Sequence, residues 1–445
     1  MSARPIQSSI TALPDHLFVL LGGEVAGILT RSNADGQIAF SYDDRWRLAR
    51  EAYALSLSLP LAGRTFAGQG VAYYLKGLLS DDPSRLSRIA AQFGVAPSDA
   101  FGLLAHIGED CPGAVQFARP DRIDALRGAG RGEITWLSES ELADLLRGLA
   151  TDDSNPGTTA DEGQFSLPGA LPKVALRWDP ARKRWGRPSG RAATTHILKP
   201  PRTGVPFHCE NEQLCLELAR ELGLDAARTS ILTVDDQTVL SVVRYDREIA
   251  RQTVTRVHQE DMSQALGVDP DLKYAAQGAP TLRQIAELLR AWSPRAVEET
   301  LRLFQAVAYN WAIAGTDAHP RNYSVLIRPG NVVALAPLYD IASSLLVHRA
   351  KPRDDPETWR LAMAVGGHTT IGEIDRAAWT DEAKRAGLKP DLVLERVTDI
   401  VSSIPGAAER VAERAVLDGI DEGFVNRFTR ETRTQSARRL RSLRN

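Results

Sequence analysis

The sequence predicts an α+β protein in which a small N-terminal α+β domain precedes a β-rich lobe and a mostly helical lobe. Three observations support this order. Strand and helix patterns alternate over 1–120, short strands bounded by turns dominate 165–250, and helical periodicity covers most of 251–445. With 445 residues, the chain is long enough for two or three domains.

Composition narrows the class of protein before any motif is considered. Lys and Arg number 54 and Asp and Glu 56, so the net charge of -2 gives no overall attraction to nucleic acid. The three cysteines form no CxxC pair and are expected to be buried thiols of a protein in a reducing cytoplasm. The first residues lack the pattern of a secretory signal, and no apolar run reaches the roughly 18 residues of a membrane span.

The first domain is expected to occupy residues 1–120. Apolar residues on both sides of Gly22-Gly23 predict a hairpin, and "IAFSYDDRW" predicts a further strand. "YLKGLLSDDPSRLSRIAAQFGV" and "DAFGLLAHIGED" predict helices, and "GAVQFARP" closes the domain as a strand. A connection over 121–164 follows, with a Ser-x-x-Glu capping box at the start of a helix over 137–150 and then the polar loop "TDDSNPGTTADEGQ".

The β-rich lobe is predicted over 165–250. "FSLPGALPKVALRWD" is a turn-rich loop that enters a strand, "RKRWGRPSGRA" is predicted to be a basic turn, and "TTHILKP" is a second strand that carries Lys199. "CENEQLCLELARELGL" predicts a helix, and "TSILTV" with "TVLSVVRYD" predicts a hairpin. Glu212 lies near the start of that helix, where a carboxylate either pairs with Lys199 or only complements the helix dipole.

The helical lobe is predicted over 251–445, and one of its helices leads into a polar turn. Ser293 and Pro294 are expected to begin this helix and Gly315 to end it. Its expected buried face consists of Val297, Leu301, Phe304, Ala308 and Trp311. At the C-terminus, "NRFTRETRTQSARRLRSLRN" is either a solvated helix face or a local nucleic-acid contact.

Three polar residues after this helix predict a site for chemistry. Asp317 and Asn322 lie in "GTDAHPRNYSVL", and Asp340 follows in "PLYDIAS". "YSVLI", the turn "RPGN" and "VVALAP" predict a hairpin, whose two ends lie together, so Asn322 is expected close to Asp340. Asn and Asp oxygens suit Mg²⁺, and a further Asp can accept a hydroxyl proton during phosphoryl transfer. The alternative is an ordinary helix-end turn, with Lys199 as an edge-strand lysine.

In this order the motifs resemble those of the HipA family of bacterial serine/threonine toxin kinases. "FSLPGALPK", otherwise a surface turn, is similar to the family's phosphate loop, "THILKP" to its lysine strand, and "VVRYDR" to the link between its lobes. "RVHQEDMSQALGV" is similar to a common segment, "GTDAHPRNYSVL" to the catalytic loop, and "LAPLYDIAS" to the metal-binding segment. The resemblance covers most of the chain and implies a two-lobed, protein-kinase-like fold that uses ATP and Mg²⁺.

The resemblance implies a role for each matching residue. Asp317 is the catalytic aspartate, and Lys199 is a second catalytic residue that contacts the ATP phosphates. Asn322 and Asp340 bind Mg²⁺ as well as ATP. Ser166 matches a serine that family members autophosphorylate, the alternative being a plain polar loop residue. The remaining ATP contacts are Pro168, Gly169, Ala170, Leu171, Pro172 and Lys173 over the phosphates, Val243, Arg244 and Tyr245 beside the adenine, and His319 beside the nucleotide.

The sequence departs from the family pattern at two places. Leu171 stands where a glutamine is expected, and Pro320-Arg321 replaces a smaller or lysine-containing pair, but neither change removes a required group.

The resemblance also implies a biological setting, that of the toxin of a toxin–antitoxin pair. The implied partners are a HipB-like helix-turn-helix antitoxin, operator DNA reached mainly through that antitoxin, and an aminoacyl-tRNA synthetase as protein substrate, with glutamyl-tRNA synthetase first. Autophosphorylation is the implied means of inactivation. A small-molecule phosphotransferase and a non-catalytic nucleotide-binding repressor component are the alternatives that the residues leave open.

Overall fold

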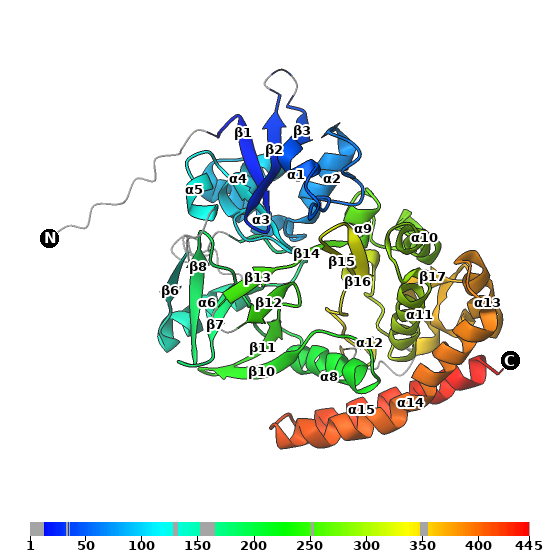
Figure 1. Cartoon of the computed structure of the whole chain (residues 1–445). Coiled ribbons are helices and arrows are strands. Elements are labelled where there is room, and N and C mark those ends of the chain that lie inside the picture. The colour runs from blue at the N-terminus through cyan, green and yellow to red at the C-terminus, as the bar shows by residue number, and fades with distance from the viewer. Residues whose placement is uncertain are drawn as a thin grey trace.

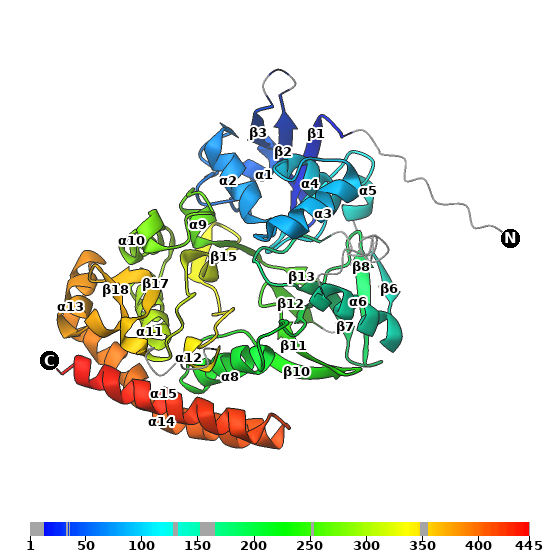
Figure 2. The ribbon, with the colours of Figure 1, turned by 180° about the vertical axis from the view of Figure 1, so that it is seen from behind.

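The computed structural model describes residues 13–127 except 33 and 35, 132–151, 165–250, 253–347 and 355–444. The predicted polar loop lies almost wholly outside these residues. An N-terminal domain, a β-rich lobe and a helical lobe surround the centre of the molecule (Figure 1), and the view from behind shows the same arrangement (Figure 2). The mixed α+β architecture that the sequence predicts is therefore confirmed.

The N-terminal domain is built on a five-stranded antiparallel sheet in the order β4-β3-β2-β1-β5. Gly22 and Gly23 have φ values of 62° and 89°, the positive values that a two-residue turn between β1 and β2 needs, so the predicted hairpin is confirmed. The strands are β1 (His16–Leu21), β2 (Glu24–Arg31), β3 (Ile38–Tyr42), β4 (Thr65–Ala67) and β5 (Val115–Ala118). The helices are α1 (Asp44–Arg47), α2 (Gln69–Gly77), α3 (Pro83–Phe93), α4 (Ala100–Ile107) and α5 (Ile123–Leu126).

The β-rich lobe is a six-stranded sheet in the order β10-β11-β9-β7-β8-β6. Its elements are β6 (Glu133–Trp136), α6 (Glu139–Thr151), β7 (Val174–Asp179), β8 (Arg184–Ser189), β9 (His196–Lys199), α8 (His208–Glu221), β10 (Thr229–Val234) and β11 (Gln237–Val243). The predicted capping box is present at α6, where the Ser138 backbone N–H donates to Glu141 Oε2 (2.7 Å) and the Glu141 N–H donates to Ser138 Oγ (3.2 Å).

One segment of this lobe was predicted wrongly. The expected basic turn is largely strand β8, which pairs with both β7 and β6. Trp185 of β8 is buried and packs against Trp178 of β7 at a ring-centroid distance of 4.5 Å. The Arg184 guanidinium lies 4.1 Å from the ring centroid of Trp136 in β6. Cross-strand aromatic packing therefore stabilises a strand whose charge suggested a turn.

The helical lobe also contains more strands than the sequence predicts. The strands are β12 (Arg247–Ala250), β13 (Thr253–Arg256), β14 (His258–Asp261), β15 (Ser324–Arg328), β16 (Val332–Leu335), β17 (Arg360–Val365) and β18 (His368–Thr370). The α-helices are α9 (Met262–Ala265), α10 (Leu282–Trp292), α11 (Ala296–Ala312), α12 (Ser344–Val347), α13 (Arg376–Arg385), α14 (Pro390–Leu417) and α15 (Glu422–Ser442). Short 3-10 turns are η1 (Ala275–Gln277), η2 (Pro320–Asn322), η3 (Pro356–Thr358) and η4 (Ile371–Glu373). Strand β15 pairs with β14 and β16, which confirms the predicted hairpin and adds a strand to it.

Helix α11, which leads into the polar turn, differs from its prediction at its start. Ser293 is the C-cap of α10, and α11 begins only at Ala296, because α10 and α11 are separate helices. Val297 is consequently 59% exposed, whereas the other residues of the predicted face are buried. The helix ends at Ala312, and the Gly315 N–H then donates to the carbonyl of Asn310 (2.8 Å), so the predicted end is close to the observed one.

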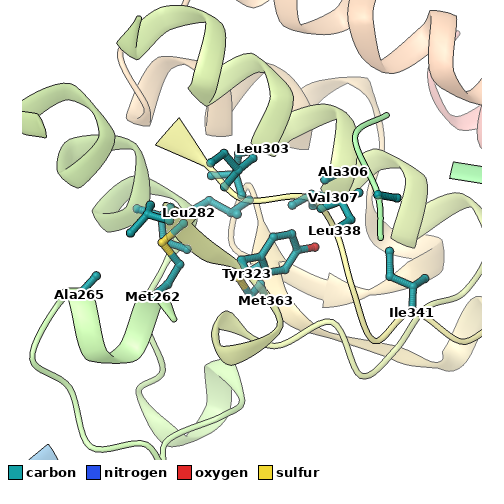
Figure 3. Close-up of a cluster of buried hydrophobic side chains, with 14 of the residues drawn as sticks. Met262, Ala265, Leu282, Leu303, Ala306, Val307, Tyr323, Leu338, Ile341 and Met363 are labelled. Atoms are coloured by element: carbon teal, nitrogen blue, oxygen red, sulfur yellow. The ribbon is translucent and has the colours of Figure 1, made fainter. Parts of the chain in front are cut away.

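A hydrophobic cluster supports the backbone around the polar turn (Figure 3). Met262 from α9, Val307 from α11, Tyr323 just before β15 and Leu338 after β16 are all buried there. Such packing holds the segments before and after the hairpin in fixed positions.

The remaining bulk predictions concern thiols and long helices. All three cysteines are free and buried, as predicted.

Helices α14 and α15 lie along each other at one edge of the molecule (Figure 1), and Arg439 of the arginine-rich segment is buried and pairs with Glu357. None of the helices in the described part of the chain has the length and hydrophobicity that crossing a bilayer requires.

Candidate active site

A cavity of about 890 Å³ lies where the three parts of the molecule meet. This volume is in the range of small-molecule and cofactor sites. All the residues predicted to bind ATP or metal or to act in catalysis line it, whereas Ser166 does not. The N-terminal domain also contributes to the lining, with Gly77, Asp81, Asp82, Arg85, Arg88 and Pro112.

A buried lysine lies between two carboxylates in this cavity. Lys199, at the end of β9, donates from Nζ to both oxygens of Glu212 in α8 (2.8 and 2.9 Å) and to Asp340 Oδ1 (2.7 Å). Burial alone would lower the pKa of Lys199, but the charges of Asp340 and Glu212 raise it, so the amine stays protonated. Of the two readings of Glu212, the pairing with Lys199 is the one observed. We call these three residues the site cluster.

Asp340 has an unusual backbone at the cavity wall. Its φ of 56° is in the left-handed region, which costs energy for a residue with a Cβ. The nearby Lys199 charge holds the pKa of Asp340 well below its usual range, so the carboxylate is ionised. Its side chain is 34% exposed, which leaves the second oxygen accessible from the cavity.

The polar turn after α11 forms a compact loop. The Asn322 Nδ2 (2.9 Å) and the His319 backbone N–H (2.8 Å) both donate to the carbonyl of Asp317. The Asp317 side chain is exposed and accepts a hydrogen bond from the Tyr274 hydroxyl (2.9 Å). His319 is buried, and burial is the main cause of its lowered pKa. The loop therefore presents one carboxylate to solvent while its backbone is held internally.

The donors around the loop fit a magnesium ion better than a metal that needs a protein cage. No group of three or more His, Cys, Asp or Glu side chains among the described residues is placed to hold a metal. Asn322 and Asp340 both line the cavity, and the hydrogen bond that Asn322 makes uses its nitrogen and leaves its oxygen for a cation. One carboxylate and one amide suit Mg²⁺, which takes its other ligands from water and phosphate.

The turn-rich loop before β7 closes another side of the cavity. Gly169 has a φ of 103°, a conformation that residues with a Cβ rarely adopt. Lys173 is buried and donates from Nζ to the carbonyl of Pro168 (2.7 Å), and burial lowers its pKa to about 8. A second cation thus lies in the cavity wall, in a loop whose shape depends on glycine.

This loop rests on the N-terminal domain. Ser166 is 2% exposed, and its hydroxyl donates to the carbonyl of Leu78 (2.7 Å). The Arg85 Nη2 donates to the carbonyl of Lys173 (3.1 Å), at the other end of the loop. The loop that is predicted to cover the phosphates is therefore supported by the N-terminal domain.

Comparison with known proteins identifies the family of this fold and site. The HipA N-terminal domain model matches residues 17–118, and the HipA-like C-terminal domain model matches residues 165–408. The chain belongs to the HipA family. It is 35% identical to "Putative kinase Y4mE" of Sinorhizobium fredii, over 91% of this chain and 94% of that protein. It is 26% identical to the serine/threonine-protein kinase toxin HipA of Shewanella oneidensis, over 92% of each chain.

The solved structures agree with this assignment at the level of the fold. A HipA chain from the Shewanella oneidensis MR-1 complex of HipA, HipB and operator DNA superposes with a TM-score of 0.79 at 22% identity. The match covers 95% of this chain and 97% of that one, which confirms the predicted HipA-like fold. At the family level, the chain is a kinase-like protein.

The HipA-like link between the lobes contains charges that the sequence analysis did not single out. Arg244, predicted beside the adenine, donates to both oxygens of Asp246 (3.0 and 2.8 Å), so its guanidinium is committed within the protein. Its neighbour Tyr245 lines the cavity, and its ring centroid lies 5.5 Å from that of Tyr339. The connected set, which we call the junction cluster, consists of Asp110, Arg244, Asp246, Arg247 and Arg256.

Sequence reasoning also missed the partners of Arg321, which lies in the polar turn after α11. Its guanidinium pairs with Asp81 of the N-terminal domain and with Asp261 of β14. In the sequence, only the departure of Pro320-Arg321 from the HipA pattern marked this position. That departure did not indicate which residues Arg321 pairs with.

Proposed function

We propose that this protein is an ATP- and Mg²⁺-dependent serine/threonine protein kinase that acts as the toxin of a type II toxin–antitoxin pair. The observation that carries the proposal is Lys199 held between Glu212 and Asp340 in a cavity that Asp317 and Asn322 also line. Phosphoryl transfer depends on positioning and on fixed charges more than on covalent chemistry, and this arrangement supplies both.

Each group has a proposed role in transfer. Lys199 holds the phosphates of ATP, and Asn322 and Asp340 are the protein ligands of Mg²⁺. When bound, that cation neutralises charge on the phosphates. Asp317 accepts the proton of the substrate hydroxyl; its exposure in the cavity and its hydrogen bond from another hydroxyl, that of Tyr274, support this role.

The remaining wall of the cavity is proposed to bind the nucleotide. Residues 168–173 cover the phosphates, and Lys173 adds a positive charge there. Val243 and Tyr245 border the adenine, with Arg244 contributing through its backbone because its side chain is held by Asp246. His319 lies beside the nucleotide as a neutral ring, in keeping with its burial. The proposed domain limits are 1–120, 121–164, 165–250 and 251–445. The HipA family models over 17–118 and 165–408 support the limits near 120 and 165.

The proposed partners come from the HipA relatives. The superposing HipA chain was solved in a complex with HipB and operator DNA, which supports a HipB-like helix-turn-helix antitoxin as the partner of this chain. A net charge of -2 favours reaching DNA through that antitoxin rather than directly. An aminoacyl-tRNA synthetase, glutamyl-tRNA synthetase first, is proposed as the protein substrate, whose phosphorylation would arrest translation.

Autophosphorylation at Ser166 is proposed as the means of inactivation. The Ser166 hydroxyl donates to a backbone carbonyl at a buried position. A phosphate carries about -1.5 to -2 charges and only accepts hydrogen bonds at neutral pH, so it cannot replace that donor beside the carbonyl. Modification therefore requires the loop to leave the N-terminal domain, and a modified loop cannot return. Once released from the N-terminal domain, the Ser166 loop reaches the active site of another copy more readily than the cavity of its own chain, which it covers.

One experiment separates this function from the alternatives. The purified chain is incubated with radiolabelled ATP, Mg²⁺ and a lysate, and the labelled species are identified, with the Asp317→Asn chain as control. A labelled synthetase supports the proposal. A labelled metabolite points to a small-molecule phosphotransferase, and ATP binding without label points to a non-catalytic repressor component. Either of these last outcomes would sink the kinase proposal.

A further inference from the structure

A carboxylate of the N-terminal domain contacts several parts of the site at once. Asp81 lies between α2 and α3, outside both lobes that form the proposed kinase. Its backbone N–H donates to the carbonyl of Gly169 in the phosphate loop (3.3 Å). Its carboxylate pairs with Arg321 of the catalytic loop and with Lys273 Nζ (2.7 Å). The side chain of Asp81 is 15% exposed, so these contacts are largely shielded from water.

The contact with Arg321 reaches one end of the catalytic loop. The Arg321 side chain is 4% exposed, and its three nitrogens donate to Asp81, to Asp261 (3.3 Å) and to the carbonyl of Gly77 (3.2 Å). Arg321 directly precedes Asn322, one of the two proposed magnesium ligands. A planar guanidinium in which each nitrogen has a fixed acceptor holds its own backbone in place, and with it the next residue.

The contact with Lys273 reaches the other end of the same loop. Lys273 is followed by Tyr274, whose hydroxyl donates to Asp317 Oδ1 (2.9 Å). Asp81 is thus linked through Lys273 and Tyr274 to the proposed proton acceptor, and through Arg321 to Asn322.

We propose that Asp81 is a positioning residue of the active site, through which the N-terminal domain holds the catalytic loop and the phosphate loop in register. This inference rests on the proposed kinase function but adds a part of the site that lies outside both lobes. Since reacting groups must be held to within a fraction of an ångström, a shift of about 1 Å costs on the order of 100-fold in rate.

The chain supplies a matched control for this inference. Lys76, in α2, pairs with Asp269 (3.0 Å) and Asp271 (2.6 Å), so it joins the same two parts of the molecule close to Asp81. Lys76 does not line the cavity. Loss of its ion pairs weakens the same domain contact but leaves the pairs of Asp81 with Arg321 and Lys273 in place.

The test compares transfer rates of six chains toward the protein that the wild type labels. Asp81→Asn is expected to lower kcat about 10- to 100-fold, with the KM for ATP changed much less, because both loops remain present but lose their register. Asp81→Glu keeps the charge and should recover part of kcat, and Lys76→Gln should match the wild type. Arg321→Gln combined with Asp81→Asn should cost less than the two single changes added together, because the two variants share the Asp81–Arg321 contact.

The outcomes separate this inference from the kinase proposal. An active wild type with unchanged kcat in a folded Asp81→Asn chain overturns the positioning role and leaves the kinase intact. If Asp81→Asn does not fold, Lys273→Gln replaces it, and an unchanged kcat in that variant also overturns the role. If the wild type transfers no phosphate, the kinase proposal fails. The positioning role is then tested by hydrogen exchange of the backbone amides of residues 315–326. Faster exchange in Asp81→Asn than in Lys76→Gln supports the positioning role, and equal exchange overturns it.

Discussion

The site cluster and the junction cluster use the same ion-pair chemistry but differ in charge balance and exposure. The site cluster sets one cation, Lys199, against two carboxylates, and Asp340 is 34% exposed toward the cavity. The junction cluster sets three guanidinium groups against two carboxylates, and each of its side chains is at most 8% exposed. Several of its further donors bond to the backbone carbonyls of Cys111 and Gly113. An excess of negative charge beside a cavity favours binding of a cation, whereas a closed cluster of paired charges only joins domains.

The largest expected effect lies beyond both clusters, at Asp317. Asp317→Asn keeps the size of the side chain and removes its ability to accept a proton, a role worth about 10²–10⁴ in rate. ATP affinity and thermal stability should change little, because the side chain is exposed and its hydrogen bond within the described residues is the one from the Tyr274 hydroxyl. Transfer measured with radiolabelled ATP, beside a thermal melt, checks this expectation. A folded Asp317→Asn chain with wild-type transfer would show that another group accepts the proton.

The second effect breaks the junction cluster. Asp246→Asn removes a carboxylate that accepts from Arg244 (2.8 Å), from Arg247 (2.9 Å) and from the Gly113 N–H (2.6 Å). Leaving such buried guanidinium groups without their partner is expected to lower the free energy of unfolding by about 3–5 kcal/mol. Asp340→Asn in the half-open site cluster should cost much less. Urea titration of both chains makes the comparison, and equal losses would mean that the two clusters contribute alike to stability.

The third prediction tests whether the excess negative charge of the site cluster binds a cation. Asp340→Ala removes a proposed ligand of Mg²⁺, so ATP binding should weaken more in the presence of magnesium than in its absence. We expect a difference of at least about tenfold, the loss seen when even a supporting group of a metal ligand is removed. Isothermal titration with and without Mg²⁺ measures it. Equal losses in both titrations would assign Asp340 a structural role toward Lys199.

The two clusters also differ in how far the sequence predicts them. Lys199, Asp317, Asn322 and Asp340 stand in short local motifs separated by a hairpin, and the hairpin itself predicts that its ends meet. The predicted residues accordingly line one cavity. Their chemical roles remain predictions.

Long-range ion pairs could not be predicted in this way. Arg321 and Asp81 are 240 residues apart, and Arg247 and Asp110 are 137 apart, so no periodicity or motif connects them. Strand β8 was missed for a related reason, because its other neighbour is β6, where Trp136 packs against Arg184, and β6 is distant in the sequence and adjacent only in the folded sheet. The start of α11 was misplaced because Ser293 and Pro294 suit a helix start, although Ser293 closes the preceding helix instead.

The smallest expected effect concerns the second cation of the cavity, Lys173. Burial lowers its pKa to about 8, whereas the carboxylates around Lys199 raise the pKa of that amine above its usual value. The charge of Lys173 is therefore present below pH 8 and is lost as the pH rises through that value, while Lys199 stays protonated. Since Lys173 lies in the proposed phosphate loop, ATP should bind more weakly at pH 9 than at pH 7.5.

The size of this pH effect is limited because bound phosphate stabilises the ammonium form of Lys173. A group with a pKa of about 8 is roughly nine-tenths neutral at pH 9. The loss of affinity therefore cannot exceed about tenfold and is expected to be a few-fold. Lys173→Met should already bind ATP weakly at pH 7.5 and show no further loss at pH 9. Lys199→Met should keep a pH dependence that is shifted to higher pH, because the charge of Lys199 is one of the causes that lower the pKa of Lys173. Fluorescent-nucleotide titrations of the three chains at both pH values make the test. A pH dependence that persists in Lys173→Met would place the titrating group elsewhere, and Lys173 and Lys199 would then differ only in their partners.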